Sequence, residues 1–198
     1  MFSKISNYVT DMIYDTLPGI EPERREVIEY GVYMTVSELV KLIVTIIVSA
    51  FIGVVPHVLC VTAVFGVQRM LLGGVHAKSH WGCMISHSAI VFSIVALSFV
   101  SYVDRLYLMI LIVPFSYITA YKYAPADLPQ KPVKSKRQRK QLRAGGYMLM
   151  AALFTAAYFL DRTWSNLILF TCFIQSALMT PLAYRITKNK YGKEEASA

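Results

Sequence analysis

The feature that most constrains the fold of this chain is a succession of long apolar runs separated by short polar segments. Of the 198 residues, 56% are hydrophobic and only 16% are charged, a balance richer in apolar side chains than that of a water-soluble domain. A run of about twenty apolar residues has the length of a helix that crosses a bilayer, where only helices and closed barrels satisfy their backbone hydrogen bonds. The sequence therefore predicts an all-α integral membrane protein that forms a single polytopic domain over residues 1–198.

Six apolar runs fit this description. We expect transmembrane helices at about 36–55, 58–72, 82–103, 106–121, 145–160 and 164–184. Pro56 and His57 mark the turn between the first two helices. Residues 1–20 precede them and contain an amphipathic helix, because apolar residues recur at helical spacing from Phe2 to Leu17. This helix is expected either on the membrane surface or packed over the helix bundle.

The net charge of +8 is concentrated in a loop at 122–143 and in the C-terminal tail. Short cytoplasmic loops of membrane proteins collect Lys and Arg, and this explains the pattern better than nucleic-acid binding, which needs an accessible basic surface. We therefore expect the lipid bilayer and no nucleic acid as a partner. Placing both basic segments in the cytoplasm gives a multi-pass protein with cytoplasmic N- and C-termini. The stretch from Leu72 to Gly82 then faces the cytoplasm.

Most of the residues that can carry chemistry gather between Gln68 and Ser88. A cysteine becomes a useful nucleophile when a neighbouring base favours its thiolate. His76 and Cys83 share one face of a continuous helix, but they would be about 10 Å apart along its axis, too far for proton transfer. Glycine allows a chain to bend, and this stretch contains three glycines at which the base could approach the thiol: Gly73, Gly74 and Gly82.

A metal site is the competing chemistry for this stretch. Four potential zinc ligands fall on one helical stripe: His76, His80, Cys83 and His87. One straight helix cannot wrap four ligands around an ion, so we predict neither a metal nor another cofactor. A metal-dependent membrane hydrolase remains an alternative. His80 and His87 are interpreted as polar residues hydrogen-bonded within the bundle, and Cys60, Cys172 and His57 as packing or interface residues.

Two charges lie near the entrance of the first expected span. Burying one charge in a membrane costs about 2.5–3.5 kcal/mol on insertion scales, so Glu38 and Lys41, one turn apart, are expected to pair. Glu38 is also a candidate to line a substrate site. Together with Arg69, these charges leave open a second alternative, a small peptide transporter or exporter without proteolysis. No internal repeat supports a transporter built from inverted repeats.

The central stretch resembles the signature of the accessory gene regulator protein B family in one motif: Arg69-x-x-x-Gly73-Gly74-x-His76-Ala77, followed by Cys83. A second segment, Tyr123-Ala124-Pro125-Ala126-Asp127 with Lys131-Pro132, resembles that family's loop after the fourth span. The length and the six-span plan are similar over nearly the whole chain. Members of the family are membrane cysteine endopeptidases of Gram-positive bacteria. They cut a small precursor, AgrD in the best-known systems, and help to form a cyclic autoinducing peptide for quorum sensing.

The resemblance implies a role for each motif residue. Cys83 would be the nucleophile and His76 the general base, with Arg69, Gly73 and Gly74 supporting the site. The acidic C-terminal region of an AgrD-like precursor would be attracted by a set of basic residues: Lys131, Lys134, Lys136, Arg137, Arg139 and Lys140. A third residue that orients the base stays open among five candidates: Ser79, Ser86, Ser88, Gln68 and Glu38. The expected location is the bacterial cell membrane, where the glycines at 66, 145 and 146 would allow the close helix contacts of a homodimer.

Overall fold

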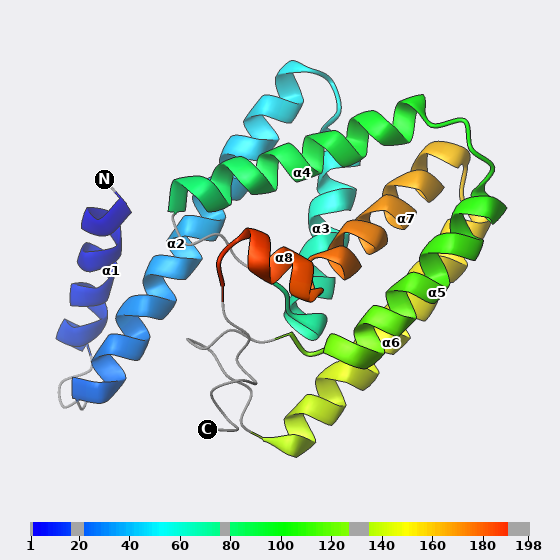
Figure 1. The fold of residues 1–198 in the computed structure, drawn as a ribbon. Coiled ribbons are helices and arrows are strands. Elements are labelled where there is room, and N and C mark those ends of the chain that lie inside the picture. The colour runs from blue at the N-terminus through cyan, green and yellow to red at the C-terminus, as the bar shows by residue number, and fades with distance from the viewer. Residues whose placement is uncertain (1, 17–21, 76–79, 127–134, 190–198) are drawn as a thin grey trace. The chain divides into compact units, whose positions relative to one another are not determined.

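The computed structural model describes residues 2–16, 22–75, 80–126 and 135–189. Within them the regular structure consists of α-helices: α1 (Phe2–Thr16), α2 (Pro22–Phe51), α3 (Val55–Leu72), α4 (His80–Val100), α5 (Arg105–Tyr123), α6 (Lys136–Phe159), α7 (Arg162–Ala177) and α8 (Pro181–Ile186). The chain divides into two compact units, residues 1–53 and residues 54–198 (Figure 1). The prediction of one polytopic domain stays a prediction.

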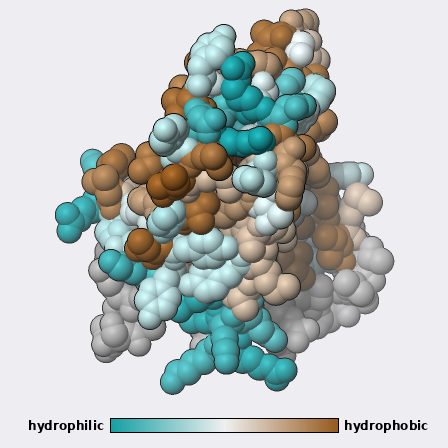
Figure 2. Space-filling view, turned by 90° about the vertical axis from the view of Figure 1, so that its right-hand side faces the viewer, coloured by the Kyte–Doolittle hydropathy of each residue, from teal (hydrophilic) through white to brown (hydrophobic). Residues whose placement is uncertain are grey.

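Four helices are long and apolar enough to cross a membrane. They lie at Gly31–Phe51, Val55–Leu72, Trp81–Val100 and Arg105–Tyr123. Large apolar side chains on them are exposed, among them Ile110 at 68% and Leu111 at 70%, which is costly in water and favourable in lipid. On the face shown in Figure 2, hydrophobic residues are exposed between hydrophilic ones, and hydrophilic residues gather at the lower edge. These observations indicate a membrane protein and agree with the first four predicted spans.

The last two predicted spans are different. Helix α7 has 16 residues, about 24 Å of helix, and is therefore shorter than the hydrocarbon core of about 30 Å. It is enclosed by protein, because it packs against α3, α4, α5 and α6. Asn166 and Gln175 are fully buried on it beside apolar residues such as Leu169. Helix α7 is therefore the central helix of the second unit, and membrane crossing by α6 and α7 stays a prediction.

The predicted sixth span at 164–184 is wrong as a continuous helix. Helix α7 ends at Ala177 and α8 begins at Pro181. Thr180 between them has an extended backbone with ψ of 153°, since a residue that precedes proline is disfavoured in the helical region. The chain thereby turns at Leu178 and exposes backbone groups for contacts outside the helix.

The predicted basic loop at 122–143 is also shorter than expected. Helix α5 continues to Tyr123, and α6 already begins at Lys136. Ser135 caps α6, because its hydroxyl accepts a hydrogen bond from the Gln138 amide at 3.4 Å. Lys, Arg and Gln are good helix formers, so the basic sequence after this cap continues as helix.

The turn between the first two spans lies earlier than predicted. Helix α2 ends at Phe51, and Gly53 has a positive φ of 72°. Pro56 stands in the first turn of α3, where a missing amide proton leaves no helical hydrogen bond unmade. His57 is likewise helical, and its ring stacks on Trp164 at 4.9 Å between centroids.

In the first unit, α1 packs against α2. Thr10 is buried there, whereas Tyr8 and Met12 are 68% and 54% exposed. The ion pair expected in α2 is present, with Lys41 Nζ donating to Glu38 Oε1 at 2.6 Å. An association of α1 with the membrane surface stays a prediction.

Candidate functional site

The site predicted from the sequence starts where α3 ends. Gly73 has φ of 76° and ψ of −153°, a combination that is open to glycine and strained for other residues. A Cβ atom at this position would overlap the Ala126 carbonyl group. The close approach is a short parallel β-bridge, in which the Gly74 amide donates to Ala126 O and the Ala126 amide donates to Leu72 O, both at 2.8 Å. Glycine at 73 is therefore required both by the backbone angles at this position and by the close contact with Ala126.

The two residues after Gly73 are held by other parts of the second unit. The Val75 amide donates to the Leu178 carbonyl oxygen at 3.2 Å, in the turn that ends α7. The Arg69 guanidinium donates to the Val75 carbonyl oxygen and lies 5.5 Å from the centre of the Phe65 ring. We call Gly73–Val75 the junction segment, since it leaves α3 and directly precedes His76.

The second motif of the sequence lies directly beside the junction segment. The Ala124 carbonyl oxygen accepts hydrogen bonds from Arg143 Nε at 2.9 Å and Nη2 at 2.6 Å. The Tyr184 hydroxyl on α8 donates to Ala126 O at 3.2 Å. The structure thus brings together the Arg69–Val75 and Tyr123–Ala126 regions, which are about fifty residues apart in the chain.

Helix α6 approaches the same region closely. A Cβ atom on Gly146 would lie 2.9 Å from Leu72 Cγ, and one on Gly145 would lie 3.4 Å from the nearest Leu71 methyl group. These two glycines serve a contact within the second unit, between α6 and the end of α3. The prediction of a homodimer stays untested.

Cys83 lies in the first turn of α4 and is half-buried. Its carbonyl oxygen accepts a hydrogen bond from Ser86 Oγ at 3.2 Å. One turn further, the His87 ring meets the edge of Phe65, with 6.0 Å between centroids. Because Phe65 also contacts Arg69, the start of α4 and the end of α3 belong to one neighbourhood.

Several predicted site residues lie outside the described part of the chain. They are His76, Ser79, Lys131 and Lys134. The structure therefore does not give the distance from His76 to Cys83. It does show that the residues before His76 are not helical and that α4 begins at His80, so a single straight helix does not run from the junction segment to Cys83. Glu38 belongs to α2 in the first unit, where it pairs with Lys41.

The other two cysteines have different surroundings. Cys172 on α7 is buried, and its sulfur accepts a hydrogen bond from Gln68 Nε2 at 2.9 Å. Cys60 is half-buried in α3, more than two helical turns before Arg69. All three cysteines fall in the described residues, and none forms a disulfide. Gln68, one of the open candidates for an orienting residue, is thus occupied by a cysteine other than Cys83.

Four of the predicted substrate-binding residues form the basic start of α6: Lys136, Arg137, Arg139 and Lys140. Three of them are exposed and Arg139 is half-buried. The lower hydrophilic edge in Figure 2 is at the level where α6 begins in Figure 1. Along the described ranges, no group of three or more His, Cys, Asp or Glu side chains could hold a metal ion. The stripe of four potential zinc ligands includes His76, which is not described.

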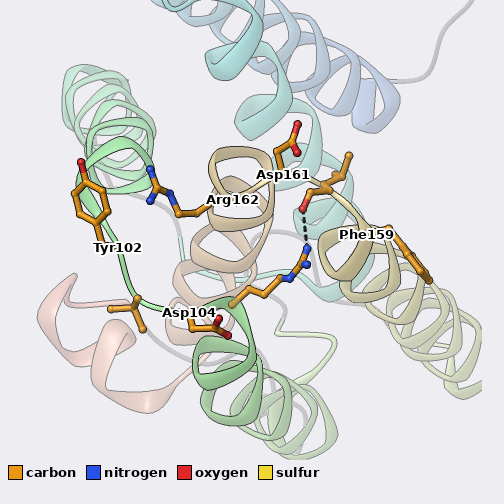
Figure 3. Close-up of a pocket in the computed structure, with 8 residues that line it drawn as sticks. Tyr102, Asp104, Phe159, Asp161 and Arg162 are labelled. Atoms are coloured by element: carbon orange, nitrogen blue, oxygen red, sulfur yellow. Dashed lines mark hydrogen bonds between the residues drawn. The ribbon is translucent and has the colours of Figure 1, made fainter.

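A cavity of about 400 Å³ lies at the N-terminal end of α5, between the α4–α5 and α6–α7 turns (Figure 3). Arg162 lies over the Tyr102 ring at 4.4 Å, and Arg105 Nη1 donates to the Leu160 carbonyl at 2.9 Å. The cavity has no cysteine or histidine in its lining. The length of α5 separates it by about 28 Å from the junction segment, so it is not part of the candidate site.

Comparisons with known proteins agree with the motifs. Residues 6–179 match the family model described as Accessory gene regulator B. Two Clostridium proteins whose names state likeness to AgrB are similar over most of their length. The protein of Clostridium perfringens strain SM101 is 24% identical over 76% of this chain and 72% of its own. That of Clostridium beijerinckii is 29% identical over 75% of this chain and 73% of its own. No solved structure matches the chain.

Proposed function

The chain belongs to the accessory gene regulator B family, and on this premise we propose that it is a membrane-embedded cysteine endopeptidase. Its substrate would be an AgrD-like peptide precursor, which it cleaves on the C-terminal side of the future signal. The product would be a cyclic autoinducing peptide for quorum sensing. The protein would cross the bacterial cell membrane six times, with both termini in the cytoplasm.

The observation that carries this proposal is the junction segment. Its glycines and Arg69 are the motif residues that the resemblance assigns to site support. In the structure, backbone and side-chain hydrogen bonds hold all three of its residues. A base must be held within hydrogen-bonding reach of the group that it deprotonates. The junction segment is fixed by these bonds and directly precedes His76 in the sequence. Cys83 follows His76 and lies in the first turn of α4.

The position of Cys83 also supports a nucleophilic role. The first turn of a helix presents backbone N–H groups that have no helical partner, and the helix dipole favours negative charge there. A thiolate is the nucleophilic form of cysteine. Cys172, buried on α7, and Cys60, inside α3, lack this placement.

The proposed reaction proceeds through an acyl-enzyme. His76 takes the proton of the Cys83 thiol, and the thiolate sulfur attacks the scissile carbonyl carbon of the precursor. The C–N bond then breaks, and His76 returns its proton to the leaving amine of the C-terminal fragment. An internal cysteine of the bound peptide attacks the resulting thioester, which closes a thiolactone ring and releases Cys83. Exclusion of water near the membrane favours this transfer over hydrolysis.

The basic start of α6 would attract the acidic C-terminal region of the precursor. Exposed like charges on a helix end raise the local concentration of an oppositely charged segment, and this attraction weakens as salt is added. Lys131 and Lys134 precede this helix in the sequence and would add to the same attraction.

Cleavage by purified protein in liposomes tests the proposal. With a cognate precursor, the wild-type protein should release a C-terminal fragment, and Cys83→Ser should bind the precursor without cleaving it. Cys60→Ser is the matched control and should cleave normally, because Cys60 lies inside α3. Cleavage by Cys83→Ser would refute the assignment. Cleavage that stops when a chelator is added would instead favour a metal-dependent hydrolase, and peptide counterflow independent of Cys83 would favour an exporter.

A further inference from the structure

We propose that Gln175 is a positioning residue of the catalytic site, one that holds the junction segment so that His76 can serve Cys83. The inference rests on the proposed function. Gln175 lies on α7, more than ninety residues from Cys83 in the sequence, and belongs to neither motif. It acts through the backbone that precedes the base.

The first argument is the hydrogen bond that Gln175 makes. Its Nε2 donates to the Gly73 carbonyl oxygen at 2.7 Å. In the described contacts, two side chains donate to backbone carbonyls of the junction segment, Arg69 at Val75 and Gln175 at Gly73. Arg69 is part of the recognised motif. Gln175 likewise donates to a backbone carbonyl of the segment, from α7 instead of α3.

The second argument is close packing. A Cβ atom on Gly74 would lie 3.6 Å from Gln175 Nε2 and 3.5 Å from the Leu178 carbonyl oxygen. The Leu178 carbonyl oxygen accepts a hydrogen bond from the Val75 amide, so two residues three apart at the end of α7 hold the first and the last residue of the segment. The end of α7 therefore acts as a rigid support against which the path into His76 is fixed.

The third argument is the burial of the glutamine. Gln175 is 0% exposed, and its Oε1 has no hydrogen-bond partner in the part of the chain that the structure describes. A buried acceptor left without a donor costs on the order of 1–3 kcal/mol. The amide is present despite this cost, and the group that its Nε2 holds is the Gly73 carbonyl oxygen of the junction segment.

The chain contains a matched control on the same helix. Asn166 is also 0% exposed, and its Nδ2 donates to the Ser98 and Ser101 carbonyl oxygens at 3.4 and 3.3 Å. Its Oδ1 likewise lacks a partner within the described residues. Asn166 thus has the same chemistry at the opposite end of α7, where it supports the end of α4 instead of the junction segment.

The test compares Gln175→Met with Asn166→Leu in liposomes. Both changes remove a buried amide of α7 while keeping its approximate volume. Misplacing a catalytic group by about 1 Å can cost about a hundredfold in rate, so for Gln175→Met we expect kcat to fall about 10- to 100-fold with KM within about twofold. Asn166→Leu should keep kcat per folded molecule. If both variants lose activity only in proportion to the loss of folded protein, the positioning role is refuted.

A second readout does not depend on cleavage. The rate at which iodoacetamide alkylates Cys83 is followed against pH, by mass spectrometry of the peptide that contains Cys83. If His76 favours the thiolate and Gln175 positions His76, the profile should move to higher pH in both His76→Ala and Gln175→Met. The double variant should then match His76→Ala alone, and Asn166→Leu should match the wild type. An unchanged profile in Gln175→Met, or a further shift in the double variant, would overturn the inference.

The two proposals can fail separately. If Cys83→Ser still cleaves the precursor, the peptidase mechanism is wrong, whatever the alkylation profiles show. If Cys83→Ser is inactive but Gln175→Met has wild-type kcat and a wild-type profile, only the role of Gln175 is wrong.

Discussion

Replacing Gly73 by alanine tests how strictly the junction segment is built. The backbone at Gly73, with φ of 76° and ψ of −153°, costs a residue with a side chain about 1–3 kcal/mol. The new methyl group would also overlap the Ala126 carbonyl. Relief requires the β-bridge to open, which gives up two hydrogen bonds of 2.8 Å, each worth about 0.5–1.5 kcal/mol. Together these effects should lower the free energy of unfolding by about 4 kcal/mol.

Gly66→Ala is the matched control for this substitution. Gly66 lies within α3, and a Cβ atom there meets no other atom within 4 Å. Alanine in a helix interior is favoured over glycine by about 0.8–1 kcal/mol, so this variant should be as stable as the wild type or more so. Reversible unfolding in mixed micelles of increasing dodecyl sulfate content, followed by circular dichroism, gives both values. The reasoning is refuted if Gly73→Ala unfolds at the same composition as Gly66→Ala.

Three further predictions concern neighbouring contacts. Gly146→Ala places a methyl group 2.9 Å from Leu72 Cγ and should lower the free energy of unfolding by about 1–3 kcal/mol. Gly145→Ala, with 3.4 Å to its nearest atom, should lower it by less. The reverse order of the two variants in thermal unfolding would contradict the packing. Arg143→Met removes two hydrogen bonds to Ala124 O and should cost about 1.5–3 kcal/mol in the same assay; wild-type stability would show that this contact contributes nothing. Replacing the basic start of α6 by glutamines should raise KM several-fold, leave kcat unchanged and weaken the salt dependence of initial rates; an unchanged KM would argue against a role in attracting the precursor.

The apolar runs were sufficient to locate four membrane-type helices to within a few residues at most of their ends. Hydropathy reports how far a helix can extend in lipid, and for α3, α4 and α5 the lipid-compatible part is nearly the whole helix. Hydropathy does not detect a helical segment that consists of charged residues. For this reason hydropathy predicts a loop for the basic segment from Lys136 to Arg143, although this segment is the start of α6. The break before Pro181 gives no hydropathy signal, because the flanking residues are apolar on both sides.

The candidate site was predictable only where its residues are neighbours in sequence. The glycines at 73 and 74 and Arg69 stand within one short motif, and the expected break of the helix at this point is observed. Contacts made across the chain carry no local signal. The Gln175 amide reaches Gly73 across 102 residues, and the Tyr184 hydroxyl reaches Ala126 across 58. A polar residue in an otherwise apolar run, such as Gln175, indicates that a buried hydrogen bond is made. The sequence does not indicate which group accepts it.

Trapping the acyl-enzyme tests the central claim most directly. Wild-type protein in liposomes is mixed with the precursor, quenched in acid within the first turnover, and digested for mass spectrometry. The account predicts an adduct with the mass of the N-terminal precursor fragment on the peptide that contains Cys83, and hydroxylamine should remove it as expected for a thioester. Cleavage that proceeds with no adduct, or with an adduct on Cys60, Cys172 or any other residue, would contradict the account.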